Sequence, residues 1–255
     1  MTKTRISLIH MEVTNSVNAN LNKADKIIRK AAKVARPNFI CLPEYFSMPP
    51  TINNTAKKMF KIAYPPTVAF RKRISAELHI HIVGGTVIER YKGDFYNTSM
   101  LLKNGEILGR YRKINLTELE IGVGIKEGAE HLVQNTKFGK VGILVCADIL
   151  FPETVQTLTS TGAEIVFLPI SQPSGTYPSV KGHPLSISNA KDNLIFILKN
   201  GCVGLNSKGD KIGSKSAIIS PWGVIKEAKS GNKEEVISAN LDLEPLRELR
   251  RKKYG

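Results

Sequence analysis

The sequence predicts an α/β fold built as one domain. Apolar, β-branched runs alternate with amphipathic stretches along the chain, which is typical of strands connected through helices. Runs such as "GILV" and "IVFL" are apolar without interruption, as expected for strands of a sheet that is covered on both faces. The 255 residues, 42% of them hydrophobic, suffice for one large core, and no stretch resembles a linker. Residues 1–255 are therefore expected to form a single domain.

The first half of the chain opens with a strand, a helix and a second strand. Residues 5–13 predict a strand, and residues 15–35 carry apolar side chains at helical spacing until Pro37 ends the pattern. Residues 38–43 predict the second strand, and residues 67–79 a second helix. Three further strands, with the turn "KNGE" joining the last two as a hairpin, are expected at 80–90, 95–103 and 107–113.

The second half repeats this alternation of strands and helices. Its strands are predicted at 140–146, 164–170, 194–201 and 235–243, its helices at 152–162 and about 182–192, and a hairpin at 216–228. The pattern fits two sheets packed as a sandwich with helices outside, and it fits a single doubly wound sheet equally well.

Charge and cysteine content narrow the classes of function. The net charge is +15, but the basic residues are spread along the chain, with dense patches only at 70–74 and 246–255 and no recognisable nucleic-acid-binding motif near them. A solvated basic surface is thus favoured over specific nucleic-acid recognition, while nonspecific attraction to polyanions is expected at this charge. The three cysteines, Cys41, Cys146 and Cys202, lie far apart without Cys-x-x-Cys spacing, which predicts free thiols and argues against a disulfide framework or a zinc cluster.

The N-terminal stretch "MTKTRISLIHMEV" bears on where the protein acts. Its apolar run is too short for a secretory signal and is followed by no small-residue cleavage site. No apolar run in the chain approaches membrane-spanning length. We expect a cytoplasmic protein that does not associate with membranes.

Three strand ends carry side chains with reactive chemistry. The stretch "FICLPEYF" places Glu44 just after a strand, "GRYRKINLTELE" places Lys113 at the end of another, and "GILVCADILFPE" places Cys146 at the third. Each residue alone has an ordinary explanation, a solvated carboxylate or ammonium or a buried thiol. Strand ends in α/β folds meet at one edge of the sheet, so the three together predict a reactive site.

The same blocks resemble a known family. The segments "LPE" (42–44), "YRKINLTELE" (111–120) and "CADILFPE" (146–153) resemble the three catalytic blocks of the carbon-nitrogen hydrolase family, or nitrilase superfamily. The segments "LPIS", "NAKDN" and "GSKSAIISPWG" downstream resemble further family blocks in the same order. The resemblance implies a four-layer α-β-β-α sandwich, and an enzyme that hydrolyses non-peptide carbon–nitrogen bonds without a metal or cofactor.

The resemblance also implies roles for individual residues. Glu44 matches the family's general base, Lys113 its electrostatic stabiliser and Cys146 its nucleophile. Glu120, seven residues after the lysine, falls at the place of a second glutamate that positions the site. Glu118 is the rival for that place, and the spacing favours Glu120.

These residue types suit nucleophilic catalysis by a thiol. A thiol with a reference pKa of about 8.5 is only a few per cent thiolate at neutral pH, so a cysteine nucleophile needs a base or a nearby cation. Glu44 and Lys113 supply one of each. We expect attack on an amide or nitrile carbon, with the Lys113 ammonium and the N–H of Ala147 stabilising the negative charge that develops, then hydrolysis of an acyl-thioester.

A cysteine–histidine pair is the competing arrangement, because histidine is the commoner partner of a cysteine nucleophile. None of the five histidines lies in a block that resembles a cysteine-protease motif. Ordinary surface or core roles are therefore favoured for them, although His131 and His183 lie in predicted loops that can approach the pocket.

Three residues are expected to shape substrate binding. Ala147 stands where family members often carry an aromatic residue, and Leu150 where amidase-type members carry an arginine, which implies a wider pocket that lacks one anchor for a substrate carboxylate. Cys202 lies in a segment that can border the family's pocket. The short chain favours the amidase-type branch and a small amide substrate. An N-carbamoyl compound, a nitrile, or a catalytically silent ligand-binding role are the alternatives, and a homodimer or higher homo-oligomer is expected.

Overall fold

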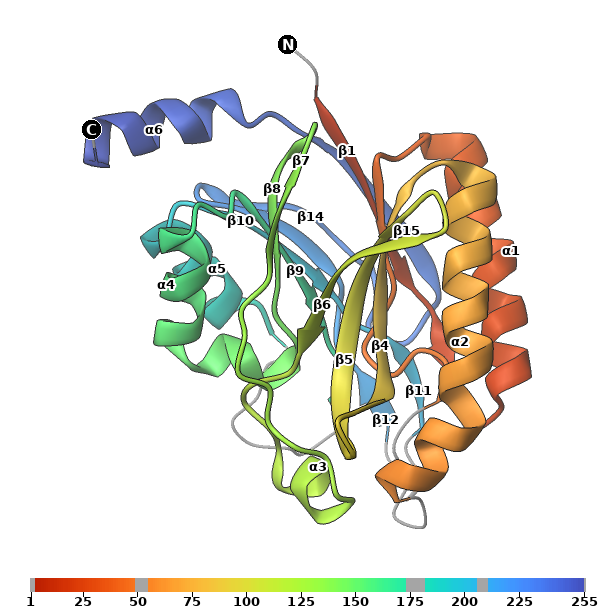
Figure 1. Ribbon diagram of the computed structural model, residues 1–255. Coiled ribbons are helices and arrows are strands. Elements are labelled where there is room, and N and C mark those ends of the chain that lie inside the picture. The colour runs from red at the N-terminus through yellow and green to blue at the C-terminus, as the bar shows by residue number, and fades with distance from the viewer. Residues whose placement is uncertain (1–2, 49–54, 173–181, 206–210, 255) are drawn as a thin grey trace.

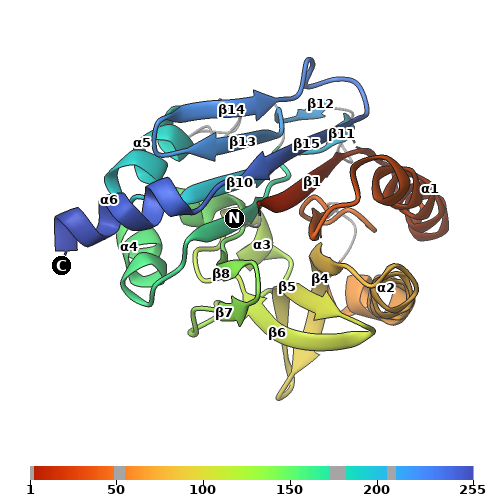
Figure 2. The same cartoon turned by 90° about the horizontal axis from the view of Figure 1, so that it is seen from above.

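Two six-stranded sheets packed face to face form the centre of the protein, and helices cover their outer faces (Figures 1 and 2). The structure is a computed structural model and describes residues 3–48, 55–172, 182–205 and 211–254. The layers run helix, sheet, sheet, helix, so the predicted four-layer α-β-β-α sandwich is confirmed, and the doubly wound alternative is wrong.

The first sheet has the strand order β15-β1-β3-β4-β5-β6. Its strands are β1 (Thr4–His10), β3 (Phe39–Cys41), β4 (His81–Tyr91), β5 (Asp94–Lys103), β6 (Glu106–Arg112) and β15 (Glu235–Leu241). β1, β3 and β4 are parallel, and the remaining neighbours pair antiparallel. The helices α1 (Val17–Ala35) and α2 (Ala56–Leu78) cover its outer face (Figure 1).

The second sheet has the order β14-β13-β10-β9-β8-β7. Its strands are β7 (Val133–Thr136), β8 (Gly139–Ile143), β9 (Ile165–Pro169), β10 (Phe196–Asn200), β13 (Ala217–Ser220) and β14 (Gly223–Glu227). The central strands β8, β9 and β10 are parallel. The helices α4 (Pro152–Ser160) and α5 (Pro184–Asp192) cover this sheet from outside (Figure 2).

Smaller elements complete the fold. A three-stranded sheet joins β2 (Glu12–Val13), β11 (Val203–Leu205) and β12 (Lys211–Gly213). The short helix α3 (Glu118–Gly122) follows β6, the 3-10 helix η1 (Cys146–Leu150) follows β8, and α6 (Glu244–Tyr254) ends the chain. No helix in the described ranges is both long enough and apolar enough to cross a membrane.

Two apolar cores hold the layers together. The larger core includes Leu8, Phe39, Phe167 and Leu198, which lie where the two sheets meet, and continues outward under α4. The second core packs the α1 and α2 helices against the first sheet, with residues such as Ile28 fully buried. Full burial of a large apolar side chain contributes roughly 1.5–3 kcal/mol, so these two cores dominate the stabilisation of the sandwich.

Local signals set the ends of α1. Ser16 caps its N-terminus by accepting a hydrogen bond from the N–H of Ala19, and Arg36 ends it in the left-handed conformation with φ of 43°. Ala24 and Ile28 lie one turn apart on the face buried against the sheet.

Helix α2 starts at Ala56, well before the predicted range 67–79. It runs through two prolines, which usually interrupt a helix. Pro65 and Pro66 lack the N–H groups that would bond to the carbonyls of Lys61 and Ile62. Both of those residues are exposed, so water can satisfy their carbonyl groups and the helix continues through the prolines.

The predicted strand 5–13 is two strands in the structure. β1 ends at His10, and after Met11 the chain joins the small third sheet as β2. The remaining predicted strands, helices and hairpins are found with shifts at their ends, and α3, α6, β7, β11 and β12 were not predicted.

Candidate active site

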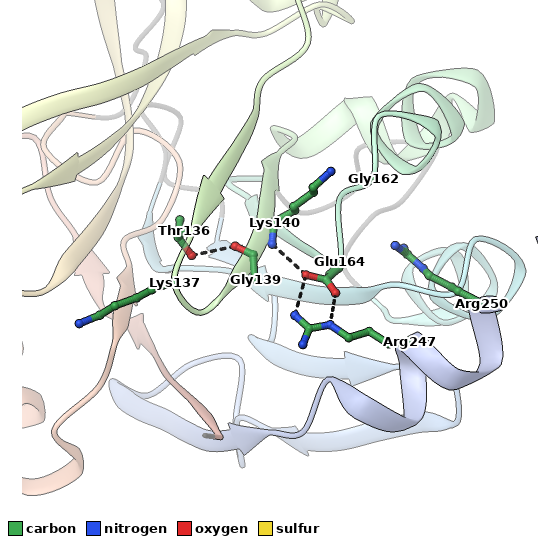
Figure 3. Close-up of a pocket in the computed structure, with 8 residues that line it drawn as sticks. All are labelled: Thr136, Lys137, Gly139, Lys140, Gly162, Glu164, Arg247 and Arg250. Carbon is green, nitrogen blue, oxygen red and sulfur yellow. Dashed lines mark hydrogen bonds and ion pairs between the residues drawn. The ribbon is translucent and has the colours of Figure 1, made fainter. Parts of the chain in front are cut away.

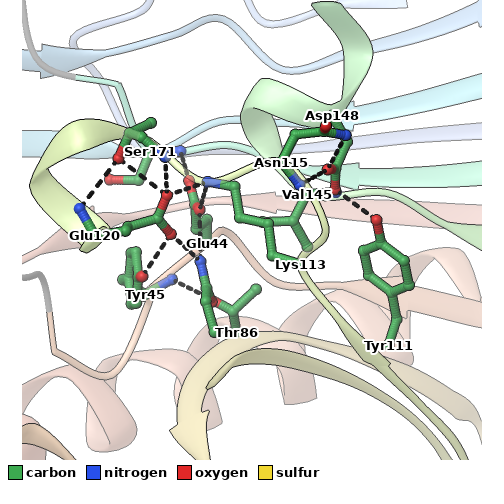
Figure 4. Close-up of polar contacts among 12 residues, drawn as sticks. Glu44, Tyr45, Thr86, Tyr111, Lys113, Asn115, Glu120, Val145, Asp148 and Ser171 are labelled. Atoms are coloured by element: carbon green, nitrogen blue, oxygen red, sulfur yellow. Dashed lines mark hydrogen bonds and ion pairs between the residues drawn. The ribbon is translucent and has the colours of Figure 1, made fainter. Parts of the chain in front are cut away.

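Glu44, Lys113 and Cys146 each follow the C-terminal end of a strand, as the sequence indicated. Glu44 comes after β3, Lys113 directly after β6, and Cys146 opens η1 after β8. Glu120 lies in α3. All four are buried, with exposed fractions of 1%, 1%, 5% and 2% for Glu44, Lys113, Cys146 and Glu120. The fold therefore brings Glu44, Lys113 and Glu120 into one buried cluster (Figure 4), whose charges also act on the Cys146 thiol.

The Lys113 ammonium lies between two carboxylates. Its Nζ atom is 3.2 Å from Oε1 of Glu44 and 2.8 Å from Oε2 of Glu120. Burial acts to lower the pKa of Lys113, but the charges of Glu120 and Glu44 outweigh it and hold the pKa well above its ordinary value. Lys113 is therefore a fixed positive charge shielded from water.

The two carboxylates have different surroundings. Glu120 accepts hydrogen bonds from the hydroxyl of Tyr45 at 2.8 Å, the Nδ2 of Asn97 at 2.7 Å, and the N–H and hydroxyl of Thr117 at 2.9 and 3.0 Å. Burial acts to raise its pKa, but the Lys113 charge and these donors hold the pKa of Glu120 below its ordinary value. Glu120 therefore stays ionised.

Glu44 has fewer donors and a pKa shifted the other way. Its Oε1 atom accepts from Asn97 at 3.0 Å, and its Oε2 atom accepts from the N–H of Ser171 at 2.8 Å (Figure 4). Burial raises the pKa of Glu44, and the neighbouring Glu120 charge adds to the rise, while Lys113 opposes it. Of the two carboxyl groups, Glu44 is the one whose pKa lies above its ordinary value, which makes it the better suited to take up a proton.

The sequence left Glu118 as a rival to Glu120. Glu118 is exposed on the first turn of α3, whereas the Glu120 side chain points into the cluster and also completes a capping box with Thr117. The geometry therefore favours Glu120.

Cys146 has an unusual backbone and a protonated resting state. Its φ is 48°, a left-handed conformation that is rare for a residue other than glycine. Burial raises the pKa of its thiol well above the ordinary value, and the Glu44 charge adds to the rise, while Lys113 opposes it. A thiol held neutral in this way must lose its proton to a base as it attacks.

A buried network fixes the turn that carries Cys146. Asp148 accepts hydrogen bonds through Oδ2 from the N–H of Val145 at 2.8 Å and the hydroxyl of Tyr111 at 2.7 Å. Its Oδ1 accepts from the N–H and the Nδ2 of Asn115 at 2.9 and 3.0 Å (Figure 4). Asp148 thus ties the cysteine turn to the chain on both sides of Lys113.

These supporting residues were not assigned from the sequence. Asp148 and Tyr45 are directly adjacent in the chain to predicted site residues, and this adjacency is the sequence signal that could have identified them. Asn97 lies in the middle of β5 and Tyr111 near the end of β6, where nothing local distinguishes them.

The residues expected to bind substrate occupy two places. Ala147 is buried in η1 beside Cys146, while Leu150 is half-buried and packs on the larger core. Cys202 is buried next to Ser171, with its Sγ 3.7 Å from the Ser171 hydroxyl. All three cysteines are free thiols, as predicted.

No histidine in the described ranges hydrogen-bonds to the cluster. His183 pairs with Glu227 at 3.0 Å, and His131 has no hydrogen-bond partner for its Nε2 atom. The described residues also contain no group of three His, Cys, Asp or Glu side chains arranged to hold a metal ion. Among the charged groups that act on the Cys146 thiol, the largest effect comes from the Glu44 carboxylate.

Comparison with known proteins decides the family. Residues 5–251 match the profile of the carbon-nitrogen hydrolase family. The chain belongs to this family. It is 30% identical over 98% of its length to an omega-amidase of Xenopus tropicalis, covering 92% of that protein. It is 29% identical over 97% of its length to a 2-oxoglutaramate amidase of Bacillus subtilis, covering 94% of that protein.

Solved structures agree with this assignment. A yeast protein from Saccharomyces cerevisiae, described as a member of branch 10 of the nitrilase superfamily, superposes with a TM-score of 0.84 at 26% identity, with 98% of this chain and 94% of that one covered. The predicted family and the predicted amidase-type carbon–nitrogen hydrolase are confirmed.

Proposed function

We propose that this carbon-nitrogen hydrolase cleaves the terminal amide of a small carboxylic-acid monoamide through an acyl-thioester on Cys146. The omega-amidase and 2-oxoglutaramate amidase relatives support this substrate class. The single observation that supports the mechanism most is the buried Lys113 ammonium held between Glu44 and Glu120, in the electrostatic surroundings of the thiol.

In the first half-reaction, Glu44 takes the proton of the Cys146 thiol as sulfur attacks the amide carbon. The C=O double bond opens, and its oxygen becomes an oxyanion stabilised by the Lys113 ammonium and the N–H of Ala147. The intermediate collapses, the C–N bond breaks, and Glu44 returns the proton to the departing nitrogen. Ammonia leaves, and the acyl group remains on sulfur as a thioester.

In the second half-reaction, Glu44 takes a proton from water, which attacks the thioester carbon. The C–S bond breaks, Glu44 gives the proton to sulfur, and the carboxylic acid is released. Lys113 stabilises the oxyanion in both halves, because a charge already fixed in a buried site needs little reorganisation. Glu120 serves as a positioning residue that keeps Lys113 charged and in place.

Ala147 and Leu150 are proposed to set the shape of the substrate site. A methyl group after the nucleophile leaves more room than an aromatic ring, and Leu150 offers an apolar wall instead of a guanidinium. Cys202, beside the Ser171 that holds Glu44, is proposed to line the same site. The substrate site is therefore proposed to be wider beside the nucleophile and apolar at Leu150.

Ammonia release from a panel of short ω-amides, N-carbamoyl compounds and nitriles tests this function. We expect turnover of ω-amides by the wild type, and none by Cys146→Ala. Cys41→Ala is the matched control and should retain activity, since Cys41 is a buried thiol whose interactions are with Leu42 and Asn200 and not with Glu44, Lys113 or Glu120. Ammonia release that persists in Cys146→Ala would refute the mechanism, and no turnover of any compound would favour a silent binding role.

We also propose a cytoplasmic homo-oligomer. Free cysteines are typical of reducing compartments. Large apolar side chains are exposed on α5, on the β13–β14 hairpin and at the start of α4, namely Phe151, Leu185, Trp222, Val224 and Ile225. Because α5 contacts both the hairpin and η1, these exposed apolar side chains favour one contact surface for a second copy of the chain. Light scattering should give a mass of two or more chains, and Trp222→Glu should reduce it.

A further inference from the structure

Two cavities open at the end of the sandwich away from the catalytic cluster. The first has a volume of about 350 Å³ and lies between the β7–β8 turn and α6 (Figure 3). Lys137, Lys140, Arg247 and Arg250 line it, together with the carboxylate of Glu164. The β7–β8 turn precedes β8, whereas Cys146 follows that strand, so the length of β8 separates this cavity from the site.

The second cavity adjoins the first and is also basic. Its volume is about 340 Å³, and Arg5, Arg36, Lys103 and Lys137 line it along with His79. Lys137 lines both cavities, so the two are neighbours on the surface, and together we call them the basic groove. Seven basic side chains and one carboxylate line the groove.

The one carboxylate of the groove is already neutralised. Glu164 binds Arg247, with 2.6 Å between Oε1 and Nε and 3.3 Å between Oε2 and NH2, and also accepts from the N–H of Lys140. Burial acts to raise the pKa of Glu164, but Arg247 and the backbone donor outweigh it and hold the pKa below its ordinary value. The carboxylate is therefore ionised, and its charge is taken up by the neighbouring Arg247 and Arg250.

Four basic side chains of the groove are exposed to solvent. Arg5, Arg36, Lys137 and Lys140 are exposed, and none of them forms an ion pair within the described residues. Clustering like charges in this way costs free energy, because unscreened cations repel one another. Such a cluster indicates an anionic ligand rather than a structural role.

We propose that the basic groove binds the phosphodiester backbone of a nucleic acid without sequence selection. A cluster of cations lining a depression attracts the phosphates of a nucleic acid, and the net charge of +15 attracts a polyanion over a longer range. Arg and Lys contacts to phosphate carry no base information, so the binding is independent of sequence. Binding of this kind agrees with the sequence, which predicts nonspecific attraction to polyanions and no specific nucleic-acid recognition.

An anionic membrane fits the groove less well. A bilayer presents a broad surface and is held in part by apolar side chains that insert into it. The apolar residues that line the groove include Leu78, Ile80 and Phe138, and all three are buried or half-buried in the described structure. The groove thus offers charge in a concave surface with little exposed apolar area.

Fluorescence anisotropy with a labelled single-stranded RNA of about 20 nucleotides tests the proposal. Binding is measured from about 50 to about 200 mM salt for the wild type and for the double variant Lys137→Glu/Lys140→Glu. The matched control is Lys57→Glu/Lys61→Glu, which changes the net charge equally near the other end of α2, roughly 30 Å along the helix from His79. All variants are checked for folding by circular dichroism.

The groove variant should bind at least about tenfold more weakly, and the slope of log affinity against log salt should fall by about 1.5, since each lost phosphate contact removes about 0.7. The control should stay within about twofold of the wild type. Equal losses in both variants, or no binding at the lowest salt, would overturn the proposal. Tighter binding to phosphatidylserine vesicles than to RNA, with the same sensitivity to the groove variant, would also overturn it in favour of a membrane.

Discussion

Replacing Glu120 by glutamine removes a charge from the buried cluster while keeping its shape. At an effective dielectric constant of about 20, two unit charges about 4 Å apart interact by about 4 kcal/mol. Glu120 is the charge that raises the pKa of Lys113 most, so its loss lowers that pKa. The Glu120 charge also raises the pKa of Glu44, so that pKa falls too.

Both limbs of the pH profile of kcat/KM for ammonia release should therefore move to lower pH in Glu120→Gln. The alkaline limb moves because Lys113 loses its proton earlier, and the acid limb moves because Glu44 ionises earlier. At neutral pH we expect kcat to fall about 100-fold, the scale of losing one oxyanion-stabilising group. Removing one partner of a buried ion pair also lowers the free energy of unfolding by about 3–5 kcal/mol, which corresponds to a fall of roughly 10 °C in Tm.

Glu118→Gln is the matched control, because Glu118 lies two residues away on α3 and is exposed. Its pH profile should match the wild type, and its stability should stay within about 0.5 kcal/mol. A Glu120→Gln enzyme with unchanged pH limbs and an unchanged Tm would show that Glu120 neither charges nor positions Lys113.

Two further predictions concern the supporting contacts. Tyr111→Phe removes the hydroxyl that donates to Asp148, so it should cost about 1 kcal/mol in urea unfolding and lower kcat, and a variant equal to the wild type in both would contradict this role. Glu164→Gln breaks the pair with Arg247 that holds α6. Arg247 and the other donors hold the pKa of Glu164 below its unfolded value. The contribution of the Glu164 carboxylate to the free energy of unfolding is therefore present above the unfolded pKa and is lost as pH falls through the folded pKa. The urea midpoints of the variant and the wild type should thus differ at pH 7 and converge below about pH 4; a difference that persists there would contradict the assignment.

Much of the candidate site followed from local sequence. Glu44, Lys113 and Cys146 each lie at or just after the end of a predicted strand, and strand ends of an α/β fold lie at a common edge. The seven-residue spacing placed Glu120 correctly against Lys113, because the loop and first turn of α3 bring its carboxylate back to the ammonium at 2.8 Å.

Other site residues depend on pairing that the sequence does not display. Asn97 reaches both carboxylates only because the register of β5 against β4 and β6 turns it inward, opposite Ile88. Tyr111 reaches Asp148 across the two sheets. Such contacts join residues that are distant in the chain, so no local pattern marks them.

The fold differed from prediction where tertiary contacts override local preference. Helix α2 continues through two prolines, because the carbonyl groups that lose their N–H partners belong to the exposed residues Lys61 and Ile62. The helix α6 is strongly basic, yet Leu243 and Leu246 pack on the core and Arg247 binds Glu164. The short strands of the third sheet have two or three residues each, too few for a period to be seen.

Trapping the acyl group with hydroxylamine tests the central mechanism most directly. If turnover passes through a thioester on Cys146, wild-type enzyme with an ω-amide substrate yields the hydroxamate as well as the acid, and Cys146→Ala yields neither. A quenched reaction should also show the protein mass increased by the acyl group. Steady ammonia release with no hydroxamate and no mass increase would contradict a covalent intermediate and with it the role assigned to the Glu44, Lys113 and Cys146 cluster.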